Sequence, residues 1–146
     1  MRTIEELRRS GVSVEPAQTI QSCAAIMEQA GVGALAVVRE GRLVGIVTDR
    51  DLVRRGLAQG LPPYATVNGV MTSPVVTVDA DADLDAAFGL FRSHAVRRLA
   101  VLRDGYFIGM ISVDDLIVDI ASDLRDLSWP IRSEVLMPQH DGPAPS

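Results

Sequence analysis

The sequence repeats itself once along its length. When the chain is shifted by 64 positions, the separation between Gly45 and Gly109, identical residues meet without a gap. The matches include residues 35–37 (Leu-Ala-Val) with 99–101, and the Asp-Leu pair at 51–52 with that at 115–116. A small unit that cannot close its own core uses its copy to do so. The 146 residues therefore predict one molecule built from two half-size units that share a core.

Each copy carries the same order of secondary-structure signals. In the first copy, apolar residues recur at helical spacing after Pro16, and Gly31 follows them where a left-handed C-cap suits glycine. Two apolar runs flanking a turn at residues 39–42 (Arg-Glu-Gly-Arg) then indicate a β-hairpin. The extended segment, hairpin strands and short final helix are expected at 12–14, 34–38, 43–47 and about 49–58, and again at 75–78, 99–102, 107–111 and about 113–123. The predicted repeat is β-α-β-β-α, and the fold class is α/β (α+β).

Changes in composition indicate where the units begin and end. Residues 59–64 (Gln-Gly-Leu-Pro-Pro-Tyr) are rich in helix breakers and predict a linker. We therefore expect a first unit with its N-terminal segment at 1–60, and the linker with the second unit at 61–127. Residues 128–146 are expected to form a C-terminal tail that is partly disordered, although residues 124–129 could still extend the last helix.

The composition restricts the function classes. A formal net charge of −5 and a pI near 4.9 argue against nucleic acid and anionic membranes as partners. No apolar run approaches the roughly 20 residues of a membrane span, and the first residues lack the pattern of a signal peptide, so a cytoplasmic protein is expected. Cys23 lies among small apolar residues and predicts a buried structural thiol. No catalytic motif or metal-ligand spacing is present, which predicts a protein that is not an enzyme and has no metal site.

Two equivalent corners carry the polar side chains of greatest interest. Thr48 with Asp51, and Ser112 with Asp115, stand where the second hairpin strand gives way to a helix. A hydroxyl followed three residues later by a carboxylate is close to a capping box, and this interpretation is favoured from one copy alone. The same two groups at a strand-to-helix corner can also hydrogen-bond the vicinal hydroxyls of a ribose. Both interpretations remain open on the sequence.

A nucleotide at such a corner needs a cation for its phosphates, because the carboxylate would repel them. Arg97 and Arg98, at the entry to the second hairpin, are the candidates, although composition alone favours a solvated pair. The equivalent positions in the first copy are Gly33 and Ala34. We therefore expect two ligand pockets to differ in phosphate affinity.

These motifs resemble the CBS domain family, whose members usually carry two such domains in tandem as a Bateman module. Residues 45–52 (Gly-Ile-Val-Thr-Asp-Arg-Asp-Leu) are similar to the family signature. Residues 67–72, followed by 75–78, are similar to the opening of a family repeat. The resemblance extends from about residue 7 to residue 123 and is nearest to the stand-alone type with two CBS domains.

The resemblance implies a site as well as a fold. It implies two repeats packed about a pseudo-twofold axis, with clefts that take AMP, ADP, ATP or S-adenosylmethionine as a ligand, and no required cofactor. The hydroxyl and acid of each corner match the family's ribose contacts, and the arginine pair matches its phosphate contact. The expected ligand-binding residues are Thr48, Asp51, Arg97, Arg98, Ser112, Asp115, Val12 and Val76.

The sequence thus predicts a regulatory module that senses an adenosine-containing ligand and responds by reorienting its repeats or subunits. The alternative is a ligand-free homodimerisation or protein-interaction module, in which the corners are only helix caps. The expected partners are a second copy of the chain and an unidentified regulated protein. The apolar helix residues expected to meet a partner are Phe88, Leu90, Phe91, Leu116, Ile117 and Ile120.

Overall fold

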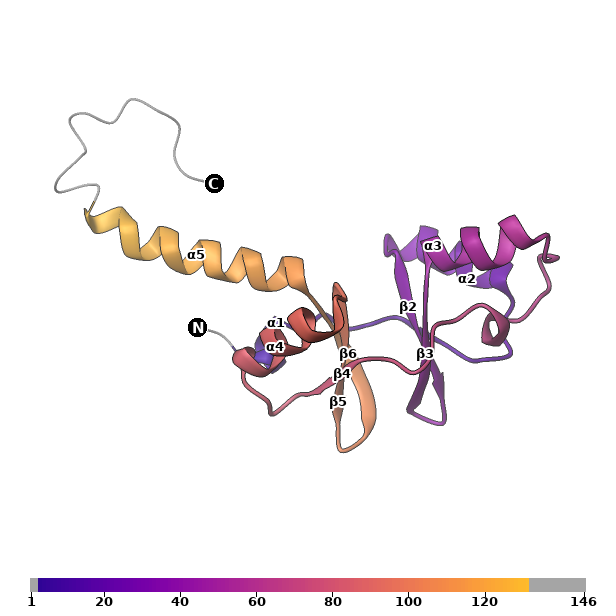
Figure 1. Cartoon of the computed structure of the whole chain (residues 1–146), viewed down its shortest axis with the longest axis horizontal. Coiled ribbons are helices and arrows are strands. Elements are labelled where there is room, and N and C mark those ends of the chain that lie inside the picture. Colours follow the sequence, from indigo (N-terminus) through magenta and orange to yellow (C-terminus); the bar gives the residue numbers. More distant parts are fainter. Residues whose placement is uncertain (1–2, 132–146) are drawn as a thin grey trace, which may run out of the picture.

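The structure is a computed structural model that describes the backbone of residues 3–131 and the side chains of residues 3–125. Within this range the strands form two three-stranded sheets, β1-β2-β3 and β4-β5-β6, one from each repeat (Figure 1). In each sheet the first two strands are parallel and the last two form an antiparallel hairpin. Two α/β repeats of β-α-β-β-α are thereby confirmed.

The two repeats differ mainly in their final helix. The first repeat contains β1 (Ser13–Val14), α2 (Ile20–Ala30), β2 (Ala34–Arg39), β3 (Arg42–Thr48) and α3 (Asp49–Asp51). The second contains β4 (Thr77–Asp79), α4 (Leu84–His94), β5 (Arg98–Arg103), β6 (Tyr106–Ser112) and α5 (Val113–Ile131). In the first repeat α3 passes into a π-helical turn at Leu52–Gly56 and a 3₁₀ turn at Leu57–Gln59, whereas α5 is one helix that projects away from the first repeat (Figure 1).

The final helices therefore differ from the expected lengths. The segment expected as a helix at about 49–58 is α-helical only at its beginning. The second final helix, expected to reach about residue 123 with a possible extension over 124–129, continues to Ile131, so the first residues of the tail expected at 128–146 are helical. The rest of that tail lies outside the described residues.

The turns and helix ends explain why the repeat folds in this way. In the first hairpin, Glu40 and Gly41 have φ values of 53° and 81°, and Asp104 and Gly105 repeat this with 52° and 84°. Two consecutive left-handed residues form the type I′ turn that suits the twist of a two-residue hairpin. Gly31 ends α2 in the left-handed conformation that the sequence predicts.

Each repeat completes the core of the other. Ile4, on the short helix α1 (Ile4–Leu7), is fully buried in the core of the second repeat. Val67, on the 3₁₀ turn Val67–Gly69 that follows the linker, and Val70 are fully buried in the core of the first repeat. Full burial of one aliphatic side chain stabilises a fold by roughly 1.5–3 kcal/mol, so these exchanged segments matter for stability. The domain boundaries expected at 1–60 and 61–127 stay a prediction. The short segment that precedes each repeat in the chain packs on the other repeat.

Backbone bridges fix the exchanged segments on the opposite sheets. The Arg9 N–H donates to the Met110 carbonyl over 2.8 Å, and the Met110 N–H donates to the Arg9 carbonyl over 3.0 Å. Ile46 and Thr72 form the equivalent bridge in the first repeat, with distances of 3.0 and 2.7 Å. Gly109 permits the first bridge, because a Cβ there would lie 2.3 Å from the Arg9 carbonyl oxygen.

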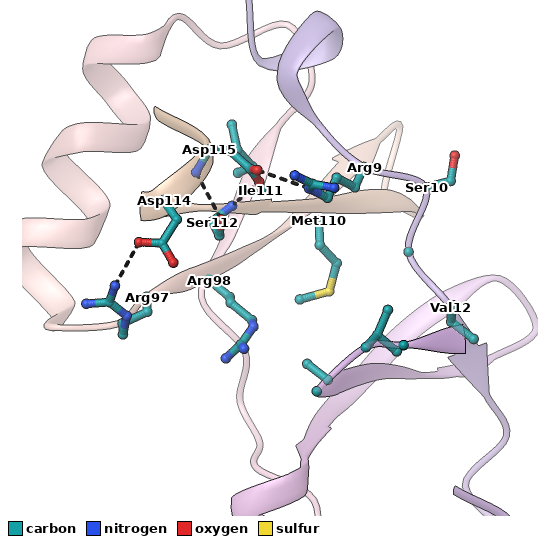
Figure 2. Close-up of a pocket in the computed structure, with 15 residues that line it drawn as sticks. Arg9, Ser10, Val12, Arg97, Arg98, Met110, Ile111, Ser112, Asp114 and Asp115 are labelled. Atoms are coloured by element: carbon teal, nitrogen blue, oxygen red, sulfur yellow. Dashed lines mark hydrogen bonds and ion pairs between the residues drawn. The ribbon is translucent and has the colours of Figure 1, made fainter. Parts of the chain in front are cut away.

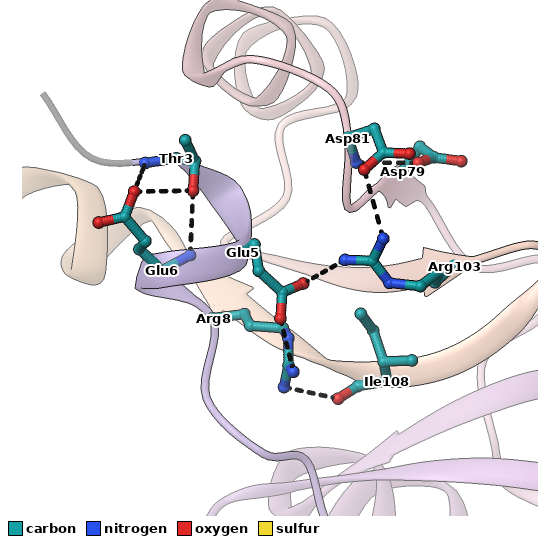
Figure 3. A network of polar contacts seen from close by, with 8 residues as sticks. All are labelled: Thr3, Glu5, Glu6, Arg8, Asp79, Asp81, Arg103 and Ile108. Carbon is teal, nitrogen blue, oxygen red and sulfur yellow. Dashed lines mark hydrogen bonds and ion pairs between the residues drawn. The ribbon is translucent and has the colours of Figure 1, made fainter.

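Ion pairs hold the same N-terminal segment against the second repeat (Figure 3). Glu5 receives hydrogen bonds from Arg8 at 2.9 Å and from Arg103 at 2.7 Å. Arg8 also donates to the Ile108 carbonyl over 2.9 Å. These arginines, Arg8 first and then Arg103, lower the pKa of Glu5 below its ordinary value. The segment at 3–12, called the N-terminal arm below, is therefore fixed to the second repeat by both main-chain and side-chain contacts.

The apolar helix faces are only partly as expected. Phe91 and Leu116 are 7% and 1% exposed, because they belong to the core of the second repeat rather than to a surface. Phe88 and Leu90 are packed against the same core. Ile117 is 55% exposed. Within residues 3–131, no helix has both the length and the apolar character to cross a membrane.

Candidate functional site

Two clefts lie between the repeats, and each takes its walls from both. The Ser112 cleft has a volume of about 310 Å³ and is lined by the N-terminal arm at 9–12, the turn at 31–34, and the corner after β6. The Thr48 cleft has a volume of about 400 Å³ and is lined by the corner after β3, by residues 72–76 apart from residue 73, and by residues 96–98. These walls correspond under the internal repeat, and both volumes are in the range of small-molecule sites.

Both corners contain a complete reciprocal cap. The Ser112 hydroxyl accepts from the Asp115 N–H over 3.1 Å, and the Asp115 carboxylate accepts from the Ser112 N–H over 3.0 Å. Thr48 and Asp51 make the same two bonds at the same distances. The capping interpretation is therefore correct at both corners. Each cap uses one carboxylate oxygen, so the capping role and a ligand-binding role do not exclude each other.

The second oxygen of Asp115 is engaged by the N-terminal arm. Its Oδ1 accepts from Arg9 Nε over 3.0 Å, as Figure 2 shows. The Asp115 side chain is 12% exposed, whereas that of Arg9 is 80% exposed. Ser112 and Asp115 both line the Ser112 cleft, so the structure brings this predicted pair together at a cavity. It also adds Arg9, which the sequence does not predict.

The Thr48 corner is arranged differently. Thr48 lines its cleft, but Asp51 does not. Asp51 makes the same cap as Asp115, but its side chain borders a separate depression with Arg50, Arg54 and Arg55. The role of Asp51 in ligand binding stays a prediction, since its side chain borders this depression and not the Thr48 cleft.

The arginine pair lies at both clefts. Arg97 and Arg98 line both the Ser112 cleft and the Thr48 cleft. They lie at the start of β5, which begins at Arg98. Arg97 pairs with Asp114 over 2.9 Å, but both side chains are about 70% exposed, which makes this a weak ion pair. Arg98 has neither an ion pair nor a hydrogen bond among the side chains at 3–125, and Figure 2 shows it extending from the second repeat towards the first.

The asymmetry of the clefts has a different source from the one expected. Since Arg97 and Arg98 are shared, Gly33 and Ala34 do not deprive one cleft of cations. A Cβ at Gly33 would lie 3.1 Å from Asp49 Oδ2 and 3.8 Å from Arg98 Nη2, so the glycine leaves room for both groups. The clefts differ instead in their remaining charges: Arg9, Asp114 and Asp115 at the Ser112 cleft, and Asp49 and Arg50 at the Thr48 cleft.

The extended segments lie where the sequence predicts. Val12 lines the Ser112 cleft and Val76 lines the Thr48 cleft. Their carbonyls accept from the Ala36 and Ala100 N–H groups over 2.9 and 3.3 Å, which joins each segment to the neighbouring strand. The two residues are equivalent in the repeat and occupy equivalent positions at the two clefts.

Other reactive groups of the described chain lie apart from the clefts. Cys23 is fully buried, as the sequence predicts, and burial raises the pKa of its thiol. No three His, Cys, Asp or Glu side chains in the described part of the chain converge on a common point. That the protein has no metal site stays a prediction.

Comparison with known proteins identifies the family. The model of the CBS domain matches residues 4–58 and 67–122. The CBS domain-containing protein YhcV of Bacillus subtilis is 37% identical over 76% of this chain and 79% of its own length. Hypoxic response protein 1 of Mycobacterium tuberculosis is 32% identical over 80% of this chain and 83% of its own.

Solved structures agree with this assignment. The crystal structure of Hypoxic Response Protein I, with two coordinated zinc ions, has a TM-score of 0.72 at 31% identity and covers 80% of this chain and 98% of that one. The CBS domain protein PAE2072 from Pyrobaculum aerophilum, complexed with AMP, has a TM-score of 0.72 at 26% identity and covers 83% and 99%. The repeat, the fold and these relatives lead to one conclusion: the chain belongs to the CBS domain family and carries two CBS domains in tandem.

Proposed function

We propose that this chain is a regulatory module, not an enzyme, which binds an adenosine-containing ligand in the clefts between its two CBS domains. The observation that carries the proposal is Arg98, a cation that lines both clefts and has no partner among the side chains at 3–125. A cation of this kind at a cavity is suited to a phosphate or a carboxylate. The AMP complex of the relative PAE2072 supports the same ligand class.

The remaining groups suit the other parts of such a ligand. A ribose presents vicinal hydroxyls, which need acceptors, and the Ser112–Asp115 and Thr48 corners supply hydroxyl and carboxylate oxygens at the cleft walls. Val12 and Val76 add apolar surface for a purine ring. AMP, ADP, ATP and S-adenosylmethionine all combine these features, and the module needs no further cofactor.

The test is calorimetric titration with AMP, ADP, ATP and S-adenosylmethionine. Hydrogen bonds to charged groups contribute about 1.5–3 kcal/mol, so Arg98→Ala should weaken AMP binding by about 10- to 150-fold. Asp115→Ala should weaken binding in the Ser112 cleft. Arg92→Ala serves as the matched control, because Arg92 is an exposed arginine at the end of α4 that lines neither cleft. If none of the four compounds binds, or if Arg98→Ala binds AMP as the unmodified chain does, the proposal is wrong.

A second role is favoured by exposed apolar side chains on the final helices. Val53 and Leu57 in the first repeat are 56% and 76% exposed, and Ile117, Val118 and Leu124 on α5 are 55%, 68% and 60% exposed. We propose that these surfaces form a homodimer, in which ligand binding alters the orientation of the domains and is read by a regulated protein in the cytoplasm.

Sedimentation at micromolar concentration should therefore give a dimer, and Ile117→Asp should shift it to a monomer. A monomeric unmodified chain would contradict the dimer. If the protein is instead a ligand-free interaction module, Asp115→Ala should lower the melting temperature without changing the binding of any adenosyl compound.

A further inference from the structure

The contact between Arg9 and Asp115 occupies the acceptor that a ribose would need in the Ser112 cleft. Asp115 Oδ2 is used by the cap, and Oδ1 accepts from Arg9 Nε over 3.0 Å. Both oxygens of this carboxylate therefore have a donor in the free chain (Figure 2). A ligand hydroxyl that hydrogen-bonds Oδ1 must compete with the guanidinium of Arg9.

The main chain of Arg9 is fixed, while its side chain is free to move. The bridge to Met110 and the close approach at Gly109 hold the backbone against β6. The side chain is nevertheless 80% exposed, and its Nε donates to Asp115 Oδ1 over 3.0 Å. Water can solvate this exposed guanidinium when it leaves the carboxylate, so its release is not costly. Arg9 can therefore turn from Asp115 without moving the N-terminal arm.

The Thr48 cleft has no such competitor. The residue that bridges its strand is Thr72, which pairs with Ile46 as Arg9 pairs with Met110, and threonine carries no charge. Among the side chains at 3–125, Asp51 has no ion-pair partner. Arg9 is thus a feature of one cleft alone, and the repeat offers a built-in comparison.

We propose that Arg9 is a specificity-determining residue of the Ser112 cleft, which favours phosphorylated over unphosphorylated adenosyl ligands. The inference rests on the proposed function. A neutral nucleoside must displace Arg9 from Asp115 and offers the guanidinium no new partner. A nucleotide displaces it in the same way, but its phosphates accept from the released Arg9 as well as from Arg97 and Arg98, which line the same cleft.

The test compares adenosine with ADP in the unmodified chain and in Arg9→Ala. Adenosine should bind the Ser112 cleft of Arg9→Ala about two- to fivefold tighter, because its ribose no longer competes with Arg9 for Asp115 Oδ1. ADP should bind at least about fivefold weaker, because a charge-assisted bond to phosphate is lost. Methyl NMR at Met110 and Ile46 reports the two clefts separately, because each residue lines only one of them.

The matched control is Arg103→Ala. Arg103 also ties the N-terminal arm to the second repeat, through Glu5 at 2.7 Å, but it lines neither cleft. Its removal should change both affinities by less than about twofold. If the N-terminal arm were only a structural support, Arg9→Ala and Arg103→Ala would each change the affinities for adenosine and ADP in the same direction.

Ionic strength gives a second readout. Adenosine is uncharged, so added salt affects its binding through the Arg9–Asp115 pair, which salt weakens. Adenosine affinity at the Ser112 cleft should therefore rise with salt in the unmodified chain and stay constant in Arg9→Ala. If Arg9→Ala does not fold, Arg9→Lys replaces it, because lysine keeps the charge and the backbone bridge but lacks the planar guanidinium. Its affinities for adenosine and ADP should lie between those of the unmodified chain and those expected for Arg9→Ala.

The outcomes separate this inference from the proposed function. Opposite shifts for adenosine and ADP support the role of Arg9. If Arg9→Ala leaves the affinities for adenosine and ADP unchanged, or shifts both in the same direction, the role of Arg9 is overturned. The proposed function still stands in that case, because both ligands bind. Absence of adenosine and ADP binding to all of these chains overturns the role of Arg9, and the proposed function is overturned as well only if AMP, ATP and S-adenosylmethionine also fail to bind.

Discussion

Substitution of Gly109 by alanine should break the backbone bridge between the N-terminal arm and the second repeat. A Cβ at this position would lie 2.3 Å from the Arg9 carbonyl oxygen, so the two backbones must separate. The two bonds between Arg9 and Met110 would be lost, at about 0.5–1.5 kcal/mol each. The lower chain entropy of unfolded alanine returns about 0.4–1 kcal/mol. From the middle of each range the expected net loss is about 1.3 kcal/mol, or roughly 3–5 °C in melting temperature for a chain of this size.

The assay is thermal unfolding followed by circular dichroism, with Gly45→Ala as the matched control. Gly45 occupies the equivalent position in the first repeat, but its added Cβ would meet the Met71 side chain at 2.4 Å, whereas the Thr72 carbonyl oxygen is 3.1 Å away. A methionine side chain can move aside, so this variant should lose less stability. Equal melting temperatures for Gly109→Ala and the unmodified chain, or a larger loss in Gly45→Ala, would refute the exchange of segments between the repeats.

Three further predictions follow from individual residues. Ala95 ends α4 with φ 53°, at the position that Gly31 occupies in the first repeat. Ala95→Gly should therefore stabilise the protein by about 0.5–1 kcal/mol in urea unfolding, and Gly31→Ala should destabilise it by a similar amount. Changes of the same sign in the two variants would contradict the equivalence of these helix ends. Because the pKa of Glu5 is lowered in the folded chain, its contribution to stability is present above the ordinary value of 4.5 and is lost as the pH falls through the folded pKa. The melting temperatures of Arg103→Ala and the unmodified chain should therefore differ at pH 7 and converge as the pH falls below 4.5 through that folded pKa. Cys23 should react with a thiol reagent only after denaturant is added, since it is fully buried and its pKa is raised; rapid labelling of the native chain would show that the core of the first repeat is open.

Much of the fold can be predicted from the sequence because local signals determine it. The left-handed turn at Glu40 and Gly41 follows from a short loop between two apolar runs, and the cap at Gly31 follows from glycine at the end of a periodic segment. Both signals act over a few residues. The internal repeat then carries each assignment from one half of the chain to the other.

The exchange of the opening segments could not be predicted in this way. It depends on pairing between Arg9 and Met110, and between Thr72 and Ile46, which are contacts between different repeats. No residue spacing encodes them. The end of α5 was left open between residues 123 and 129 for a related reason, because the end of a helix whose apolar residues are exposed is not marked by a core contact.

The candidate site likewise combines residues placed by local signals with residues placed by contacts between the repeats. Ser112, Asp115 and Thr48 line clefts as predicted, since a strand-to-helix corner is a local feature. The place of Arg98 at both clefts, the turning of Asp51 to a separate depression and the arrival of Arg9 all depend on how two repeats meet. Basic residues in the irregular opening at 8–12 were the one signal in the sequence that could have indicated Arg9.

The most direct measurement of the central claim is a crystal structure of the chain grown with AMP. The account predicts AMP in a cleft between the repeats, with the ribose against the Ser112–Asp115 or the Thr48 corner and the phosphate on Arg98. AMP bound elsewhere on the surface, or clefts that stay empty at saturating AMP, would contradict it.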